Sequence, residues 1–442
     1  MKILLCQSYL GPDEPPIFPL GLSCIAAALE GHEVRTYDPN VSGSPMGGLA
    51  AAVEEFQPDV VGISLRSIDS THTFAVSFYY GYLRPMLEAI KGACPGAVIV
   101  VGGPAFSIFA GEIMPDQPLI DYGVSLEGEV SFPGLLDNLG RPAAVKGIYY
   151  RSGGDVIFTG ASDPPRSFPS PRRDLFDSSL YTSWEDAVGV ETKRGCVLKC
   201  AYCTYPFLSG SAMRLKDPDD VAGEMEDISA RHGVKIVIFT DSVFNLPRAH
   251  AEAICERLID RNVRISWSAW LSARNTDREF LILARRAGCV KISFSPDAYS
   301  DHSLSLLRKG ITMADISRSF SAARSVGGMR VAYNFFGDPP GSRAADFIRL
   351  LGFYARARLL LRGRLAGFNI SRIRIEPHTE IRDMALGEGQ IERGASLLDP
   401  VFYRNVSAPL VELLFSLFTR LKEGLKRLKG RFAGPDRGAA HG

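Results

Sequence analysis

Three cysteines, Cys196, Cys200 and Cys203, lie within eight residues of one another. Thiolates are soft ligands that suit zinc and iron–sulfur clusters. A structural zinc site takes four protein ligands, whereas this loop offers three, with no fourth cysteine or histidine beside them. A four-iron cluster held by three thiolates keeps one iron without a protein ligand, and that iron can bind a substrate or cofactor. The spacing therefore favours an iron–sulfur cluster with one open iron.

The composition of the whole chain indicates a reduced, aqueous compartment. Eight cysteines in 442 residues, behind an amino terminus that lacks the layout of a signal peptide, favour free thiols over disulfides. No uncharged apolar run of about 18 residues is present. The net charge of +1 gives no field that would attract nucleic acid. We expect a cytoplasmic protein whose other cysteines are small buried core residues, namely Cys6, Cys24, Cys94, Cys255 and Cys289.

The cysteine loop follows a predicted strand at residues 188–192 and precedes a series of β-α units. Asp217 and Pro218 open the next helix as N-cap and first helical residue, and that helix ends at Gly233. Six units of this kind predict a partial barrel, because the array curls, with its active site at the carboxyl ends of the strands. The further predicted strands are residues 234–240, 264–269, 291–295, 329–336 and 367–375.

Residues 1–140 form a second series of alternating strands and helices. Such a series predicts a doubly wound parallel sheet that binds ligands beyond the carboxyl ends of its strands. Glycine pairs and prolines between residues 153 and 171 indicate a hairpin and a linker. We predict an α/β protein with domains at 1–145 and 184–375, a linker at 146–183 and a carboxyl-terminal segment at 376–442. The predicted strands of the first domain are 2–6, 33–38, 59–64 and 97–101, and its helices are 20–29, 49–56 and 76–93.

With Tyr202 directly before the third cysteine, the cysteine loop resembles the cluster loop of radical S-adenosylmethionine (SAM) enzymes. That family requires the loop after the first strand of a six-unit barrel, as predicted for this chain. The resemblance implies a 4Fe-4S cluster whose open iron chelates the amino and carboxylate groups of SAM. It also implies that an electron from the cluster cleaves SAM to a 5′-deoxyadenosyl radical, with Tyr202 near the adenine.

Later segments resemble the stretches of this family that contact SAM, although surface or capping duty is the alternative for each polar residue. Asp241 follows the second strand and departs from the commoner Gly-Gly-Glu form of the family. Arg274 is a candidate partner for the methionine carboxylate, and Asp297 stands in the acidic place of the fourth-strand segment. The SAM-binding set that the resemblance implies is Tyr202, Asp241, Ser242, Ser268, Arg274, Asp297 and Asn334.

Residues 1–140 resemble the cobalamin-binding domain that precedes the barrel in one large class of these enzymes. The resemblance is carried by the proline-rich stretch 15–29, the glycine pair in 100–104 and the acidic-glycine loop 123–129. Glycines after a strand let the backbone approach a large flat ring, although the bare topology would also suit a nucleotide or a flavin. The implied cobalamin-binding set is Ser64, Leu65, Arg66, Ser67, Gly102, Gly103, Pro104, Glu127, Gly128 and Glu129.

The first domain lacks the Asp-x-His-x-x-Gly loop whose histidine ligates cobalt from below in cobalamin domains of the mutase and methionine-synthase kind. The loop after the third strand contains Leu65 and Arg66, and an arginine stays protonated and cannot ligate cobalt. We therefore predict cobalamin without a lower axial histidine, with Leu65 or Arg66 facing the cobalt. For the nearby His72 we expect a role in the loop or as a helix cap.

Residues 409–432 predict a helix with an apolar stripe surrounded by basic residues. The pattern favours a helix that packs this stripe on the barrel, and a membrane-surface helix is the alternative. Residues after 434 have the composition of a disordered end. The predicted stripe is Leu414, Leu417, Phe418, Leu421, Leu425 and Leu428.

Together the two resemblances imply a cobalamin-dependent radical SAM methyltransferase that transfers a methyl group from methylcobalamin to an unactivated carbon of a small molecule. An unactivated C–H is far too weak an acid for a side-chain base, which favours a radical route. One alternative keeps both cofactors but ends in cyclisation, rearrangement, oxidation or aminocarboxypropyl transfer. Another is a non-catalytic protein that binds or senses corrinoid and cluster. The expected protein is a monomer served by a flavodoxin- or ferredoxin-type electron donor, without nucleic acid.

Overall fold

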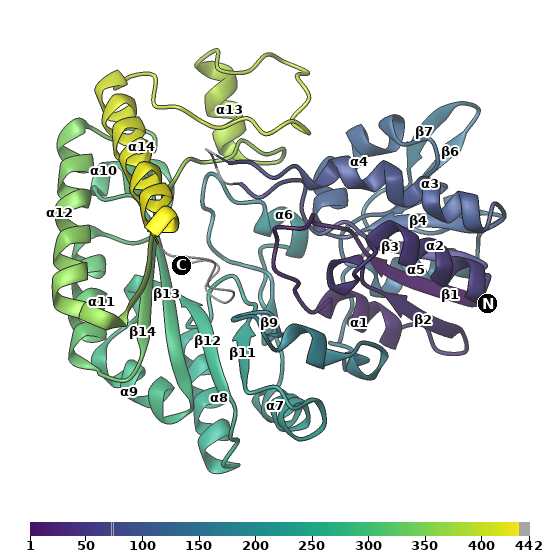
Figure 1. Ribbon diagram of the computed structural model, residues 1–442, viewed down its shortest axis with the longest axis horizontal. Coiled ribbons are helices and arrows are strands. Elements are labelled where there is room, and N and C mark those ends of the chain that lie inside the picture. The colour runs from purple at the N-terminus through teal and green to yellow at the C-terminus, as the bar shows by residue number, and fades with distance from the viewer. Residues whose placement is uncertain (72, 74, 433–442) are drawn as a thin grey trace.

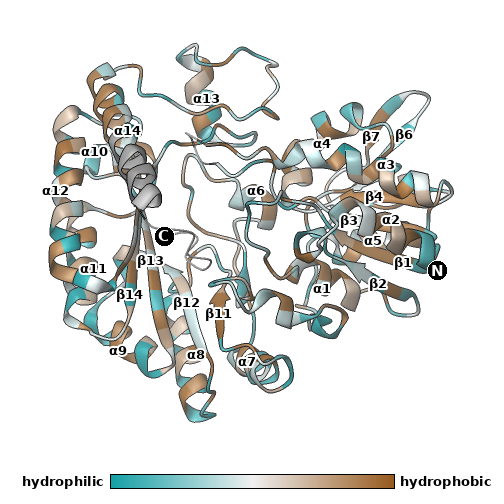
Figure 2. Ribbon diagram, viewed as in Figure 1, coloured by the Kyte–Doolittle hydropathy of each residue, from teal (hydrophilic) through white to brown (hydrophobic). Residues whose placement is uncertain are grey.

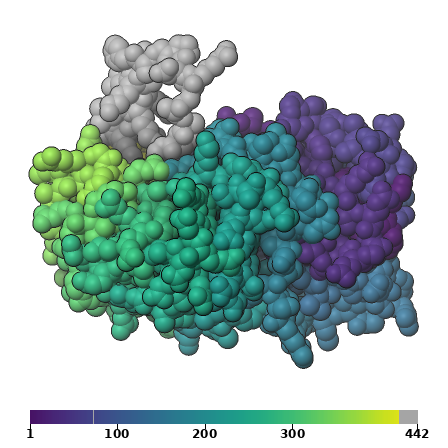
Figure 3. All heavy atoms as spheres, turned by 90° about the horizontal axis from the view of Figure 1, so that it is seen from below, coloured from purple at the N-terminus to yellow at the C-terminus, as the bar shows by residue number. Residues whose placement is uncertain are grey.

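The computed structural model describes residues 1–71, 73 and 75–432, and for residues 421–432 it describes the helical backbone alone. His72 and the predicted disordered end after residue 434 lie outside these residues. Two lobes lie side by side, each built on one large sheet, with the short helix α6 (Tyr205–Ser209) between them (Figure 1). The space-filling view shows the amino-terminal lobe and the barrel lobe in contact through the chain that links them (Figure 3).

The amino-terminal sheet has the strand order β2-β1-β3-β4-β5-β6-β7. Its first five strands are parallel, and the β6–β7 hairpin joins the edge in antiparallel fashion. This arrangement confirms the predicted doubly wound sheet. The strands are β1 (Lys2–Gln7), β2 (Glu33–Tyr37), β3 (Val60–Ser64), β4 (Val98–Gly102), β5 (Tyr122–Val124), β6 (Ile148–Ser152) and β7 (Asp155–Phe158), and the helices are α1 (Leu20–Ala27), α2 (Pro45–Phe56), α3 (Leu83–Ala93), α4 (Pro104–Asp116) and α5 (Gly128–Leu136).

The helix predicted at residues 76–93 is wrong at its start. Helix α3 begins at Leu83, after a 3-10 turn at Tyr79–Tyr82. The backbone N–H groups of Tyr79 and Tyr80 donate to the Ile68 carbonyl at 2.8 and 3.0 Å, which ties this segment to the loop after β3. These two N–H groups therefore bond to the loop after β3 and not to carbonyls within a longer helix.

The second sheet has the order β15-β14-β13-β12-β11-β8 with every pair parallel, which confirms the predicted six-stranded partial barrel. Asp217 caps α7 by accepting the Asp219 N–H, and Gly233 ends that helix at φ +63°, both as predicted. The strands are β8 (Gly189–Val190), β11 (Ile236–Phe239), β12 (Ser266–Leu271), β13 (Cys289–Asp297), β14 (Arg330–Phe336) and β15 (Leu365–Ser371), and the helices are α7 (Pro218–His232), α8 (Arg248–Asp260), α9 (Arg278–Arg286), α10 (Asp301–Leu306), α11 (Met313–Ser325) and α12 (Ala344–Leu361).

The carboxyl-terminal segment forms α13 (Glu380–Gly387) and the predicted helix α14 (Pro409–Phe432). Val411 and Phe415 of α14 are fully buried, so the packed interpretation is confirmed for the part whose side chains are described. The predicted stripe is wrong at Leu417, which is 47 % exposed. The buried face is rotated because the Phe415 ring packs over Gly337 after β14, where a side chain would collide with it.

Apolar residues concentrate in the sheets and on the inner faces of the helices, as Figure 2 shows for β1 and β11. The buried side chains form one continuous cluster that runs through both lobes. Within the described part of the chain, no helix combines the length and the apolar character that crossing a membrane requires. The core thus holds the two sheets in place, and the loops at the carboxyl ends of their strands can form binding sites.

Candidate active site

A short antiparallel ribbon closes the base of the cysteine loop. Strand β9 (Lys193–Arg194) pairs with β10 (Arg214–Leu215), and the loop runs between them. Gly195 has φ +86°, and a Cβ there would lie 2.1 Å from the Ala212 carbonyl oxygen. Glycine is therefore required at this position, because the two ends of the loop touch.

The three cysteines line one cavity of about 400 Å³ at the carboxyl ends of the barrel strands. Burial raises the pKa of Cys200 and raises that of Cys203 to about 11. In a four-iron cluster each thiolate binds a different iron, so the three sulfurs need not surround one ion. Consistently, no group of three or more His, Cys, Asp or Glu side chains in the described residues is placed to hold a single metal ion. Three soft ligands on one cavity fit such a cluster.

Tyr202 of the predicted SAM set lines this cluster cavity, and it contacts Asp297 of the same set, which does not itself line the cavity. The Tyr202 hydroxyl donates to the Asp297 carboxylate and accepts from the Lys309 ammonium at 2.8 Å. Lys309 and Asp297 also form a buried ion pair. Burial raises the pKa of Asp297, although Lys309 opposes that shift. The three groups hold the aromatic ring of Tyr202 at the cavity wall.

Asp241 and Ser242 also line the cluster cavity, but the carboxylate of Asp241 is occupied by protein groups. It accepts the Thr192 N–H at 2.9 Å and pairs with the fully buried Lys193 ammonium at 2.8 Å. These contacts join the strand before the cysteine loop to the end of β11. The structural role of Asp241 is to hold these two segments together, and a role in binding SAM stays a prediction.

The remaining predicted SAM residues lie elsewhere. Ser268 and Asn334 line a second cavity inside the barrel, where Ser268 donates to Asp186 at 2.5 Å. Arg274 is exposed and donates to the Gly310 carbonyl at 3.4 Å. The structure thus places Tyr202, Asp241 and Ser242 on the cluster cavity and Asp297 against Tyr202, apart from these three.

The second cavity, which we call the barrel lumen, measures about 640 Å³. Thr240 and Trp270 line both the lumen and the cluster cavity, so the two adjoin at these side chains. Arg66, from the loop after β3, lines the lumen from the amino-terminal domain. Burial lowers the pKa of its guanidinium. The barrel interior therefore adjoins the cluster cavity on one side and the first domain on another.

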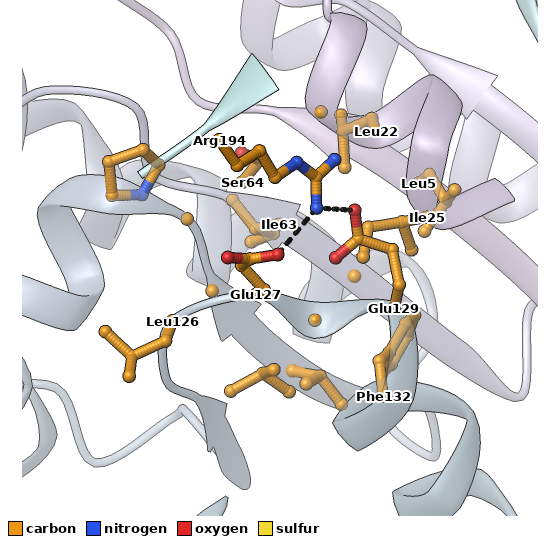
Figure 4. A pocket seen from close by; sticks show the side chains of 18 residues that line it. Leu5, Leu22, Ile25, Ile63, Ser64, Leu126, Glu127, Glu129, Phe132 and Arg194 are labelled. Carbon is orange, nitrogen blue, oxygen red and sulfur yellow. Dashed lines mark hydrogen bonds and ion pairs between the residues drawn. The ribbon is translucent and has the colours of Figure 1, made fainter. Parts of the chain in front are cut away.

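A third cavity, of about 240 Å³, lies at the carboxyl ends of the strands in the amino-terminal domain (Figure 4). Gly103 there has φ +95°, and a Cβ would lie 2.8 Å from the Leu65 carbonyl oxygen, so only glycine fits. Leu65 itself is buried, and Ser67 lines neither this cavity nor the lumen. The predicted cobalamin residues found on its wall are Ser64, Gly102, Gly103, Pro104, Glu127, Gly128 and Glu129.

Several residues of these sites were not predicted. Arg194 lines the third cavity although it belongs to the barrel, and Lys309, Thr240 and Trp270 line the cluster cavity. Arg194 stands two residues before the first cysteine, and this closeness to the cysteine loop could have marked it as a site residue. Thr240 follows β11, Trp270 lies within β12 and Lys309 follows α10, and no distinctive local pattern marks the three, so only the fold brings them to the site.

Comparisons with known proteins agree with this architecture. The family model of the B12 binding domain matches residues 10–136, and that of the radical SAM superfamily matches residues 190–350. The uncharacterized methyltransferase PH0819 of Pyrococcus horikoshii is 26 % identical over 347 residues, which are 74 % of this chain and 72 % of that protein. The anaerobic magnesium-protoporphyrin IX monomethyl ester cyclase of Cereibacter sphaeroides is 26 % identical over 284 residues, 60 % of this chain and 44 % of the cyclase.

Among solved structures, the chain resembles the radical SAM methyltransferase TsrM from Kitasatospora setae, with cobalamin and a [4Fe-4S] cluster bound. The TM-score is 0.77 at 21 % identity, covering 92 % of this chain and 82 % of TsrM. At that identity the likeness establishes the shared fold. The chain belongs to the radical SAM enzymes that carry a B12-binding domain before the barrel.

Proposed function

We propose that this protein is a cobalamin-dependent radical SAM methyltransferase that acts on a small polar molecule. The observation that carries the proposal is the junction of the cluster cavity and the lumen at Thr240 and Trp270, with Arg66 of the cobalamin domain on the lumen wall. A radical formed beside the cysteines would need to reach a substrate in the lumen, and a methyl donor would need to face the same space. Two adjoining cavities that share these wall residues suit both requirements.

In this proposal Cys196, Cys200 and Cys203 hold the cluster, and Tyr202 and Ser242 bind SAM beside it. The third cavity holds the nucleotide tail of cobalamin, and we call it the tail cavity. Bound cluster and SAM supply a carbon-centred radical, and bound cobalamin supplies a methyl group. The protein holds these groups in one orientation and excludes water from the lumen, which is how proximity contributes to rate. A flavodoxin- or ferredoxin-type protein is the proposed electron donor.

We further propose that cobalamin binds here without a histidine below the cobalt. Arg66 is the residue of the β3 loop that reaches the lumen, and none of the described residues lining the lumen or the tail cavity is a histidine. An arginine offers donors but no lone pair, so it cannot serve as a cobalt ligand. Electron paramagnetic resonance of the cobalt(II) form should show no nitrogen hyperfine splitting from a protein ligand, and such a signal would contradict this part.

The lumen favours a polar substrate. Asn369 donates its amide to the Asn334 carbonyl oxygen at 3.0 Å, and both side chains line the lumen. At the amino-terminal end of the barrel, Lys291 pairs with Asp186 at 2.5 Å, and Arg330 pairs with Glu185. Because amide and charged groups line this space, a substrate with carboxylate, amide or amine groups can hydrogen-bond to its wall and suits it better than a lipid tail.

Ring closure is the second candidate, because one relative is named a cyclase. The chain spans less than half of that protein, so the activity of the cyclase is no more than an alternative for this chain. Methyl transfer consumes SAM with release of S-adenosylhomocysteine, whereas a radical outcome without methylation releases 5′-deoxyadenosine alone. The ratio of these two products separates the candidates.

The proposal is tested by anaerobic reconstitution of the full chain with iron, sulfide and hydroxocobalamin. We expect about four irons and one corrinoid per chain, and reductive cleavage of SAM when dithionite is added. Loading of iron without corrinoid would restrict the proposal to a radical SAM enzyme without cobalamin. Loading of both without any SAM turnover would favour a binding or sensing protein.

A further inference from the structure

The ribbon that closes the cysteine loop carries two arginines in register. Arg194 of β9 lies opposite Arg214 of β10 in the antiparallel pairing. At the same place the Cys196 N–H donates to the Gly210 carbonyl at 3.1 Å. The ribbon and this bond bring the start and the end of the loop together, so a force on the ribbon acts directly on the arrangement of the cysteines.

Both arginines reach across the lobe boundary to the loop after β5 in the B12-binding domain. Arg194 Nη1 lies 2.8 Å from Glu127 Oε2 and 2.7 Å from Glu129 Oε1. Arg214 Nη1 lies 3.0 Å from the same oxygen of Glu127. Arg194 Nε also pairs with Glu191 at 2.9 Å. We call Arg194, Arg214, Glu127 and Glu129 the lobe clamp.

The lobe clamp is shielded from water, which makes it sensitive to geometry. The side chains of Arg194, Glu127 and Glu129 are 10 %, 13 % and 9 % exposed. A guanidinium held between two such carboxylates has a fixed position, because moving it would leave a buried charge without a partner. The Arg194 guanidinium also lies 5.4 Å from the centre of the Phe168 ring in the linker.

The same three charged side chains form one wall of the tail cavity. Figure 4 shows the Arg194 guanidinium over the cavity, with both glutamates directed toward it. Glu127 is the N-cap residue of α5, and Glu129 lies in the first turn of that helix. Whatever fills the cavity therefore contacts the partners of Arg194, and Arg194 stands two residues before Cys196.

We propose that the lobe clamp couples occupancy of the tail cavity to the stability of the cluster loop, with Arg194 as its positioning residue. The proposal rests on the proposed function, since it takes the ligand of the cavity to be the nucleotide tail of a corrinoid. A tail in the cavity confines Glu127 and Glu129, which then hold Arg194 and the ribbon in the arrangement that gathers the cysteines. By linkage, a loaded cluster strengthens binding of the tail by the same factor.

This coupling differs from a merely structural ion pair in one testable respect. A structural pair would stabilise the loop to the same extent with and without corrinoid. A coupling pair stabilises it more strongly when the cavity is filled, and a corrinoid without a nucleotide tail, such as cobinamide, should add no such stabilisation. The comparison of cobalamin with cobinamide therefore isolates the tail cavity from the rest of the corrinoid site.

The test uses the full reconstituted chain and measures the rate at which an iron chelator removes the cluster. For the unmodified chain we expect cobalamin to slow iron release by about ten-fold, and cobinamide to leave it unchanged. Arg194→Gln should abolish the effect of cobalamin, and Arg194→Lys should restore part of it. The matched control is Arg173→Gln, because Arg173 pairs with Glu224 at 2.6 Å, is also buried and lines none of the three cavities. The control should retain the full effect.

Two results would overturn the coupling while the proposed function stands: equal protection by cobinamide, or full protection by cobalamin in Arg194→Gln. A chain that binds no cobalamin at all would overturn the proposed function and the coupling with it. If Arg194→Gln does not yield folded protein, Glu129→Gln replaces it, because it removes one carboxylate charge and keeps the shape of the side chain. The dissociation constants of cobalamin with and without cluster provide the reciprocal measurement.

Discussion

The three cysteines of the loop differ from the other cysteines of the chain in where they lie, and that difference can be measured. Cys200 lines the cluster cavity, whereas Cys255 is fully buried in the packed face of α8. Replacing Cys200 by alanine should remove the cluster and SAM cleavage, because two thiolates do not hold four irons. Iron analysis and the electron paramagnetic resonance signal of the reduced cluster measure the loss. Cys255→Ala should retain both, and normal iron content in Cys200→Ala would contradict the assignment.

The buried pair of Lys309 and Asp297 gives a second prediction for single residues. Lys309→Met would leave the Asp297 carboxylate buried without its cation, and such losses cost about 3–5 kcal/mol. The adjacent Arg308 forms an exposed pair with Glu380, so Arg308→Met should change the free energy of unfolding by less than about 1 kcal/mol. Urea unfolding of the two variants makes the comparison. Equal effects would show that the buried pair does not hold this wall of the cavity.

For single elements, helix α14 closes the side of the barrel where β14 ends. Phe415 packs over Gly337 and is fully buried, whereas Leu413 on the same helix is 55 % exposed. Phe415→Ala should lower the free energy of unfolding by about 3–5 kcal/mol, because it leaves a cavity. Leu413→Ala should change it by no more than about 0.5 kcal/mol. Similar losses in the two variants, measured in urea, would argue against the packing of α14 on the barrel.

The same helix contacts a buried ion pair through Glu412, which lies 3.3 Å from Arg372, and the charge of that buried pair depends on pH. Asp338 Oδ2 lies 3.3 Å from Arg372 Nε, and burial raises the pKa of Asp338 to about 6 from its usual value near 4. Because the folded state holds this proton more tightly, the stability due to Asp338 is present below pH 4 and is lost as the pH rises through 6. The loss amounts to about 3 kcal/mol. The free energy of unfolding, measured from pH 4 to 7, should fall less steeply in Asp338→Asn than in the unmodified chain. Parallel curves for the two proteins would contradict the raised pKa of Asp338.

The elements that the sequence predicted best are those whose ends carry local signals. Helix α7 has both Asp217 and Gly233 at its ends, and the structure confirms both. The helix that was predicted to begin at residue 76 begins at Leu83, because Tyr79 and Tyr80 bond to a loop distant in sequence. The stripe on α14 was wrong at Leu417, since the position of the buried face depends on the space that Gly337 leaves. Tertiary contacts decide such cases, and a local pattern does not contain them.

For the whole molecule, the order of the sheets and the three-cysteine loop could be predicted from the sequence, whereas the pairs that join distant segments could not. Lys193 with Asp241 is one example, and Arg194 with Glu127 joins the two lobes across 67 residues. Ser268 and Asn334 line the lumen and not the cluster cavity, and their expected role in binding SAM stays a prediction. A motif fixes which residues follow a strand, but the curvature of the barrel decides which cavity they face.

In the proposed function, methyl transfer and radical formation use one protein and the one SAM-binding site beside the cysteines. The measurement that tests this most directly needs no knowledge of the substrate. The reconstituted chain, with reduced cobalamin bound, is mixed with SAM that carries a deuterated methyl group, and the products are separated by mass spectrometry. We predict S-adenosylhomocysteine in step with labelled methyl in the cobalamin fraction. Production of 5′-deoxyadenosine with no labelled corrinoid would contradict the assignment as a methyltransferase.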